Sequence, residues 1–215
     1  MLRLVLVRHG QTDANLNRVL QGQSDGELNA TGSRQAEELG RHLKDFRIDQ
    51  IIASPMRRAQ DTAAAIARHH QLAVKTSPLI VEWNCGVLDG VPAEVFRKKL
   101  QESNVPLSSF RPEGGETLQE VQQRATAFLS ELVASYQNQT VLVCSHGDFM
   151  RALVSLLLQI SIEEASGIYF DNASYSILEF ESGHWNPVAF NRSSEKNDRF
   201  THGDVYKKIS VQDSC

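Results

Sequence analysis

This sequence has few cysteines, no long apolar run and no large excess of charge of one sign. Three cysteines occur in 215 residues, Cys85, Cys144 and Cys215. An odd count at long spacings argues against a disulfide framework and against a zinc site. It is typical of a reducing compartment, so we expect a cytoplasmic protein. The N-terminal apolar run is interrupted by Arg3 and ends at Arg8, too short for a signal-peptide core or a bilayer span.

The charges are nearly balanced. Lys and Arg number 22 and Asp and Glu number 26, which gives a net charge of −4. Tight nucleic-acid binding draws on a basic face, and a membrane surface attracts runs of basic residues, so we expect neither partner. No group of carboxylates and histidines has the spacing of metal ligands, so we expect no metal and no other cofactor.

Short apolar runs alternate with helical patterns along the chain. "LRLVLV", "QIIAS" and "TVLVCS" are typical of parallel strands that are buried on both faces. Thr31 is expected to be the N-cap of the first long helix. Ser54 is expected to cap the next one, with Pro55 at its first helical position. Further helices are expected over residues 115–136 and 147–160.

The C-terminal third ends in a predicted hairpin, two strands around the turn Glu181-Ser182-Gly183, at an edge of the sheet. Strands that alternate with helices predict an α/β fold. We expect a three-layer sandwich with a mostly parallel central sheet and helices on both faces. This domain is expected over residues 1–191, with a C-terminal tail or small appendage over residues 192–215.

Charged side chains gather where the three parallel strands end. The first strand ends at Arg8-His9, the third ends at His146-Gly147, and Arg58 follows the second in the first turn of a helix. The carboxyl ends of parallel strands meet at one crevice, so these side chains are expected to face one ligand. Arginines bind phosphate oxygens with paired N–H donors, and helix N-termini add further donors. The sequence therefore predicts a phosphate site.

The same residue types support phosphoryl transfer. A neutral imidazole can attack phosphorus and become a phosphohistidine, while a hydrogen bond, often to a backbone carbonyl, holds its other nitrogen. A second, protonated histidine can stabilise the transition state. The leaving alcohol needs a proton from a carboxylic acid whose surroundings raise its pKa. Glu82, with apolar residues before it and Trp83 after it, is the best candidate for this acid.

Six segments carry a family resemblance in the right order: "LVRHGQTDAN", "LNATGSRQAEELG", "ASPMRRAQDTA", "EWNCGVLDG", "PEGGETL" and "VCSHGDFMRAL". They resemble the motifs of the histidine phosphatase superfamily, which has the phosphoglycerate mutase-like fold. With the final hairpin, the likeness covers residues 1–191. Several motifs in sequence are far more specific than the first one alone.

The resemblance implies a role for each matching residue. His9 would be the nucleophile, and Glu82 the general acid and later the base that activates water. With these two, the catalytic set includes Arg8, Arg58 and His146, which would hold the phosphate and its transition state. The residues that would bind phosphate or flank the substrate are Arg8, Asn15, Gln21, Gly22, Arg58, His146 and Gly147.

The chain departs from the family beside the acid motif. Leu79 stands where many members have Arg, and Trp83 stands where mutases commonly have Arg, so an arginine for a second charged group is missing. Mutases also have a longer basic insert after this motif, and "GGET" is commoner among phosphatases. We therefore expect a metal-independent phosphomonoester hydrolase that acts on a small phosphorylated metabolite. A phosphoglycerate mutase-type phosphoryl transferase is the alternative.

Two other classes are open on the sequence alone. "GQSDG", residues 22–26, matches the Gly-x-Ser-x-Gly motif of serine hydrolases, but that motif needs a strong strand before it and a helix directly after it. A non-catalytic phosphate-binding module is the other class, although every proposed catalytic position is filled. The natural substrate and the oligomeric state do not follow from the sequence.

Overall fold

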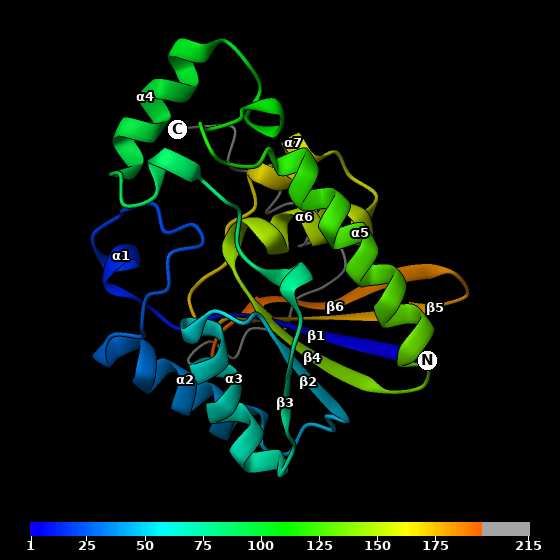
Figure 1. Ribbon diagram of the computed structural model, residues 1–215. Helices are drawn as coiled ribbons and strands as arrows, with labels where there is room; N and C mark the ends of the chain where they lie inside the picture. The colour runs from blue at the N-terminus through cyan, green and yellow to red at the C-terminus, as the bar shows by residue number, and fades with distance from the viewer. Residues whose placement is uncertain (195–215) are drawn as a thin grey trace.

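One mixed sheet of six strands lies between two layers of helices in the computed structural model, which describes residues 1–194 (Figure 1). The strands lie in the order β3-β2-β4-β1-β5-β6. They are β1 (Leu2–Arg8), β2 (Gln50–Ala53), β3 (Val74–Thr76), β4 (Thr140–Ser145), β5 (Tyr175–Glu181) and β6 (His184–Arg192). The first four strands in this order run parallel to one another. The strand β5 runs antiparallel to both of its neighbours, β1 and β6. The predicted fold class is confirmed.

The helices cover both faces of the sheet and its carboxyl end. They are α1 (Asp13–Leu16), α2 (Ala30–Leu43), α3 (Arg57–His70), α4 (Ala93–Ser103), α5 (Leu118–Ser135), α6 (Gly147–Leu158) and α7 (Ile162–Ser166). Short 3-10 helices are η1 (Pro78–Ile80), η2 (Gly86–Leu88) and η3 (Leu107–Ser109). The pair α2 and α3 packs on one face, and α5 and α6 on the other (Figure 1). The helices α1 and α4 lie beyond the carboxyl ends of the parallel strands (Figure 1).

Alternate side chains of β1 enter two separate cores. Leu4 and Leu6 pack with residues of α5 and α6, and Val5 and Val7 pack with residues of α2 and α3. All four are fully buried. Burying such a side chain stabilises the fold by about 1.5–3 kcal/mol relative to leaving it exposed. Because both faces are covered, the strand is a continuous apolar run, and it ends where charged residues begin.

Two predicted helix caps are wrong. Asn29, rather than Thr31, caps α2, because its side chain accepts a hydrogen bond from the Gly32 N–H at 2.8 Å. The helix α3 begins at Arg57, with extended Met56 as its N-cap and no side-chain cap. The hydroxyl of Ser54 lies 2.8 Å from a ring nitrogen of His146 and accepts from the Met56 N–H at 3.4 Å, one residue before the helix begins. Ser54 and Pro55 therefore precede the helix.

The predicted hairpin is present, and β6 forms an edge of the sheet. Its turn is Ser182-Gly183, where φ is +54° and +85°; two left-handed residues are the requirement of a tight hairpin turn. The strand β6 ends at Arg192, and residues 195–215 of the predicted tail lie outside the described part of the chain. Among residues 1–194, no helix is long and apolar enough to cross a membrane.

Candidate active site

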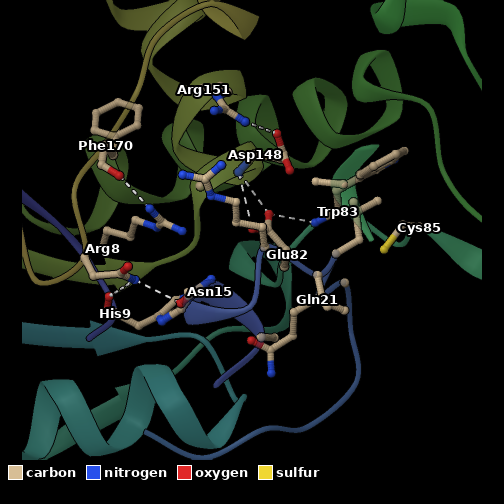
Figure 2. Close-up of a pocket in the computed structure, with 18 of the residues that line it drawn as sticks. Arg8, His9, Asn15, Gln21, Glu82, Trp83, Cys85, Asp148, Arg151 and Phe170 are labelled. Atoms are coloured by element: carbon tan, nitrogen blue, oxygen red, sulfur yellow. Dashed lines mark hydrogen bonds and ion pairs between the residues drawn. The ribbon is translucent and has the colours of Figure 1, made fainter. Parts of the chain in front are cut away.

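A cavity of about 500 Å³ opens where β1 and β4 end (Figure 2). Side chains from α1, the following loop, the segment after η1 and the start of α6 complete its wall. The predicted site residues that line it are Arg8, His9, Asn15, Gln21, Gly22, Glu82 and Gly147. Two predicted residues, Arg58 and His146, are fully buried and do not line it.

His9 lies at the inner wall of the cavity and is 3% exposed. Its Nδ1 lies 2.7 Å from the carbonyl oxygen of Gly10. A carbonyl only accepts, so Nδ1 carries the proton and Nε2 keeps its lone pair. Burial, and then the charges of Arg8 and Arg58, hold the pKa of His9 well below its usual value. The ring is therefore neutral, with a fixed tautomer and the lone pair of Nε2 available.

A buried hydroxyl anchors Gly10, the residue whose carbonyl meets His9, through the N–H of the His9–Gly10 peptide. The Gly10 N–H donates to Thr62 Oγ1 at 3.0 Å, and that hydroxyl donates to the Arg58 carbonyl at 2.7 Å. Thr62 is fully buried on α3. The hydroxyl thus links the turn after His9 to the helix that carries Arg58.

Arg8 and Asn15 line the cavity close to His9 (Figure 2). Arg8 donates from Nη1 to the Phe170 carbonyl at 2.5 Å, and its guanidinium also meets the side chain of Tyr169. Its Nε is buried and has no hydrogen-bond partner within residues 1–194. The Asn15 carbonyl oxygen accepts from Asn172 Nδ2 at 3.0 Å, which leaves the Asn15 amide N–H groups for a ligand. Both side chains therefore hold hydrogen-bond donors beside the nucleophile.

Arg58 and His146 form a buried pair next to His9. Arg58 Nε donates to His146 Nδ1 at 3.2 Å, and the rings of His9 and His146 have centroids 5.1 Å apart. Since Nδ1 accepts, Nε2 carries the proton and donates to Ser54 Oγ. Burial first, and then Arg58, hold the pKa of His146 well below its usual value. His146 is therefore neutral here, whereas the sequence reasoning considered a protonated second histidine.

The guanidinium of Arg58 is directed at a loop rather than at the cavity. Its Nη2 donates to the Gly22 carbonyl at 2.8 Å, and its Nη1 donates to the Ser24 carbonyl at 2.9 Å. A buried guanidinium needs acceptors, and these carbonyls supply them. The loop at the cavity wall is thus tied to the two histidines through one cation.

Glu82 is buried at the N-terminus of α6 and is 7% exposed. Its Oε1 accepts from the N–H groups of Trp83, Asp148 and Phe149 at 2.9, 3.1 and 3.1 Å. Burial, followed by repulsion from the Asp148 carboxylate, raises the pKa of Glu82 to about 7, although the N–H donors oppose this shift. Oε2 accepts only a longer contact from the Asp148 N–H, at 3.4 Å, so it is the oxygen more available to hold a proton.

Three groups converge at the first residue of α6. A Cβ on Gly147 would lie 3.8 Å from Glu82 Oε2 and 3.9 Å from Arg8 Nε. The positive end of the helix therefore faces the same point as the unpaired Nε–H of Arg8 and the less occupied oxygen of Glu82. This arrangement suits a phosphate ester whose bridging oxygen receives a proton.

The serine-hydrolase alternative does not fit the geometry. Ser24 lies in an exposed loop between α1 and α2, with neither a long strand before it nor a helix directly after it. Its hydroxyl donates to Asp89 at 2.9 Å instead of contacting a histidine. Cys144, on β4, is fully buried in the core and does not line the cavity.

Sequence reasoning missed several residues that shape the site. Thr62 and Asn172 hold the turn after His9 and the side chain of Asn15. Asp148, one residue after the predicted Gly147, carries the charge that repels the Glu82 carboxylate. Its position directly after "SHG" was the available signal. Asn172 gave no such signal, because it is brought to the site by the pairing of β5 with β1.

The comparison with protein families agrees with the motifs. The sequence profile of the histidine phosphatase superfamily (branch 1) matches residues 4–193. This chain belongs to the histidine phosphatase superfamily. The predicted family is thereby confirmed, and the match ends close to the end of β6.

The sequence matches to relatives cover nearly the whole domain. The uncharacterized phosphatase PhoE of Bacillus subtilis is 35% identical over 196 residues, which cover 90% of this chain and 96% of that protein. A probable phosphoglycerate mutase GpmB of Proteus mirabilis is 31% identical over 189 residues, covering 86% and 88%. The structure of a mycobacterial glucosyl-3-phosphoglycerate phosphatase complexed with VO3 has a TM-score of 0.81 at 30% identity, covering 89% of this chain and 99% of that one. The family and these names identify an enzyme of the phosphatase type, as predicted.

Proposed function

We propose that this protein hydrolyses phosphomonoesters through a phosphohistidine at His9. The observation that carries the proposal is the single tautomer in which the His9 imidazole is held. Its Nδ1 proton is held by the Gly10 carbonyl, and the lone pair of Nε2 stays free beside a cavity that Arg8 and Glu82 also line. A neutral imidazole in one tautomer is the nucleophile that this chemistry needs.

In the first step, Nε2 of His9 bonds to phosphorus and the bond from phosphorus to the ester oxygen breaks. The Oε2–H of Glu82 gives its proton to that oxygen, so the alcohol leaves neutral. In the second step, the Glu82 carboxylate takes a proton from a water molecule as the oxygen of that water bonds to phosphorus. The N–P bond breaks and inorganic phosphate is released. Glu82 then holds a proton again, which a pKa of about 7 favours near neutral pH.

The negative charge of the transferring group is held by donors around His9. The unpaired Nε–H of Arg8 and the amide of Asn15 supply hydrogen bonds, and Gly147 offers the helix N-terminus. Arg58 and His146 act from behind the nucleophile. Arg58 adds positive charge and helps to keep both rings neutral. Buried, preorganised donors of this kind stabilise transition-state charge far better than water does.

The substrate is a small phosphorylated metabolite. A cavity of about 500 Å³ accommodates a ligand of that size. Beyond the phosphate-binding residues, its wall combines Val19, Leu20 and Trp83 with the cations Arg18 and Arg151. Gln21 and Gly22 form the wall on the side of α1. We also place the protein in the cytoplasm, because the described cysteines Cys85 and Cys144 are free thiols.

Phosphate release from a panel of phosphomonoesters tests the proposal, with His9→Ala as the control and a mutase assay run beside it. Hydrolysis without a bisphosphoglycerate primer is expected. The mutase alternative has support from the GpmB relative. Primer-dependent transfer between the hydroxyls of one substrate, with little net phosphate release, would favour it.

A further inference from the structure

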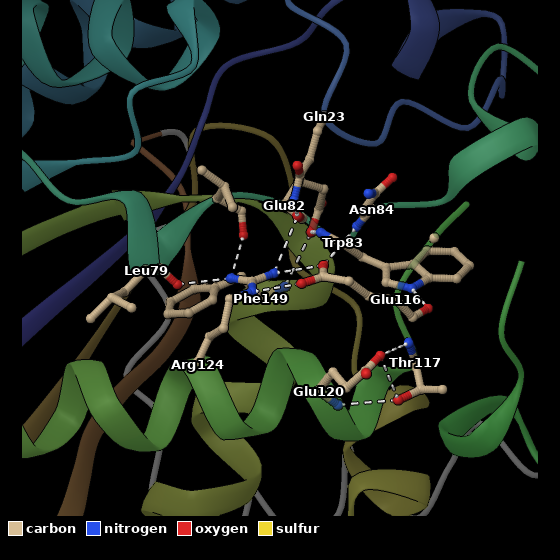
Figure 3. Close-up of polar contacts among 12 residues, drawn as sticks. Gln23, Leu79, Glu82, Trp83, Asn84, Glu116, Thr117, Glu120, Arg124 and Phe149 are labelled. Atoms are coloured by element: carbon tan, nitrogen blue, oxygen red, sulfur yellow. Dashed lines mark hydrogen bonds and ion pairs between the residues drawn. The ribbon is translucent and has the colours of Figure 1, made fainter. Parts of the chain in front are cut away.

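One arginine holds the backbone of the segment that carries Glu82 (Figure 3). Arg124, on α5, donates from Nη1 to the carbonyls of Leu79 and Val81 at 2.8 and 3.2 Å. Its Nη2 donates to the Glu82 carbonyl at 3.3 Å. Three carbonyls within four consecutive residues thus meet one guanidinium. The planar fork of donors makes this possible, and a lysine ammonium could not reproduce it.

The same guanidinium is fixed by Glu116. Arg124 Nε donates to Glu116 Oε1 at 2.9 Å, and Nη2 donates to Oε2 at 3.0 Å, a two-point ion pair. Glu116 Oε2 also accepts from the Asn84 N–H at 2.9 Å, and the Glu116 carbonyl accepts from the Trp83 indole N–H at 2.6 Å. The two charged residues therefore hold the chain on both sides of Glu82.

The segment has little regular structure of its own to hold it. The 3-10 helix η1 ends at Ile80, and η2 does not begin until Gly86. Between them the backbone groups of the chain must find partners elsewhere. Arg124 supplies donors to the carbonyls, and Glu116 supplies acceptors to the N–H groups. Gln23 also donates to the Glu82 carbonyl at 2.9 Å and Ser145 to the Ile80 carbonyl at 2.8 Å, but Arg124 is the side chain that joins three of these carbonyls at once.

The carboxyl group of Glu82 requires that placement. Its Oε1 meets the N–H groups of Asp148 and Phe149 at 3.1 Å each, while Oε2 is left near Gly147. A backbone shift of about 1 Å at such a site can cost on the order of 100-fold in rate. Loss of the N–H contacts would also remove a pKa-lowering influence on Glu82. Movement of the segment would therefore change both the position and the acidity of the acid.

We propose that Arg124, held by Glu116, is a positioning residue that sets the geometry of the Glu82 acid through the carbonyls of residues 79–82. The inference rests on the proposed function, in which Glu82 protonates the leaving alcohol. Arg124 does not line the cavity, so it does not contact the substrate itself, and Arg124→Lys keeps the positive charge that acts on His146. If Arg124 had a purely structural role, its replacement would lower kcat/KM equally for all substrates.

The test compares Arg124→Lys with the wild type on two substrates, by kcat/KM. An alkyl phosphate needs a proton on its leaving group, and p-nitrophenyl phosphate needs it far less. We expect Arg124→Lys to lose at least about tenfold more activity on the alkyl phosphate than on p-nitrophenyl phosphate, within the ~10²–10⁴-fold range of general acid catalysis. We also expect its alkaline pH limb to move to higher pH. Arg111→Lys is the matched control, because Arg111 contacts Glu120 and the Gly115 carbonyl but not the Glu82 segment.

A double mutant makes the test specific. In a Glu82→Gln background, Arg124→Lys is expected to add little further selectivity, since residues that act as one unit are not additive. Equal losses on both substrates, an unmoved pH limb or full additivity would overturn the inference while leaving the proposed function intact. If Glu82→Gln itself shows no selectivity, the proposed acid is wrong and this inference is overturned with it. If Arg124→Lys does not fold, Glu116→Gln is the variant that tests the inference. It weakens the ion pair that fixes Arg124, so it must show the same substrate selectivity.

Discussion

Removing the hydroxyl of Thr62 tests the hydrogen bond that anchors Gly10, the residue whose carbonyl fixes the tautomer of His9. Thr62→Val keeps the shape of the side chain but leaves the Gly10 N–H without its acceptor in a buried site. The Arg58 carbonyl keeps its helical partner, since both residues lie in α3. The change therefore leaves one unsatisfied buried donor, and the peptide that holds His9 loses its anchor.

The magnitude follows from that single group. An unsatisfied buried donor costs about 1–3 kcal/mol of the free energy of unfolding. For a chain of this size about 2–4 °C of Tm is lost per kcal/mol, so the expected fall is between about 2 and 12 °C. Freedom of the Gly10 carbonyl lets the His9 ring tilt, and a loss on the order of 10–100-fold in kcat/KM is expected.

Thermal unfolding and kcat/KM with p-nitrophenyl phosphate measure the two effects on the same preparations. Thr62→Ser is the control, because it keeps the hydroxyl and removes only a methyl group. It should retain most of the activity. A Thr62→Val protein with the Tm and activity of the wild type would refute the reasoning that this hydroxyl positions His9.

Four further outcomes are expected. Glu82→Gln should reduce kcat/KM for an alkyl phosphate far more than for p-nitrophenyl phosphate, by up to the ~10²–10⁴-fold worth of a general acid, and equal losses would show that Glu82 only positions phosphate. In the pH profile of kcat/KM, activity should fall as pH rises through about 7, where Glu82 loses its proton, and this limb should vanish in Glu82→Gln. The acid limb of His9 should lie below pH 6.5, because burial lowers the pKa of His9; a limb above that value would contradict the neutral ring. Activity should survive EDTA, because arginines and helix dipoles supply the positive charge, and recovery only on adding a metal ion would contradict this.

The sequence predicted the layers and most of the site because both follow from local patterns. Apolar runs end in Arg8-His9 and His146-Gly147, and parallel strands bring their carboxyl ends to one edge. Glu82 could be named from its apolar neighbours and its family motif. The burial that raises its pKa depends on its contact with the start of α6, which the motif alone does not show.

The contacts that hold these residues were not predictable in the same way. Thr62 and Arg124 look like ordinary residues of amphipathic helices, and only packing shows what their polar atoms touch. Serine is a common N-cap residue, yet Ser54 lies before the helix and its hydroxyl contacts His146. Arg58 was expected to point into the crevice, but its buried guanidinium is bonded to loop carbonyls. Long-range hydrogen bonds decided each case.

The most direct measurement of the central claim is to isolate the covalent intermediate. The enzyme is mixed with a ³²P-labelled phosphomonoester, quenched in alkaline detergent within milliseconds, and analysed by peptide mapping. We expect one labelled peptide, with the phosphoryl group on His9, that is stable in alkali and lost in acid, and no label in His9→Ala. Label on another residue, or full turnover by His9→Ala, would contradict the account.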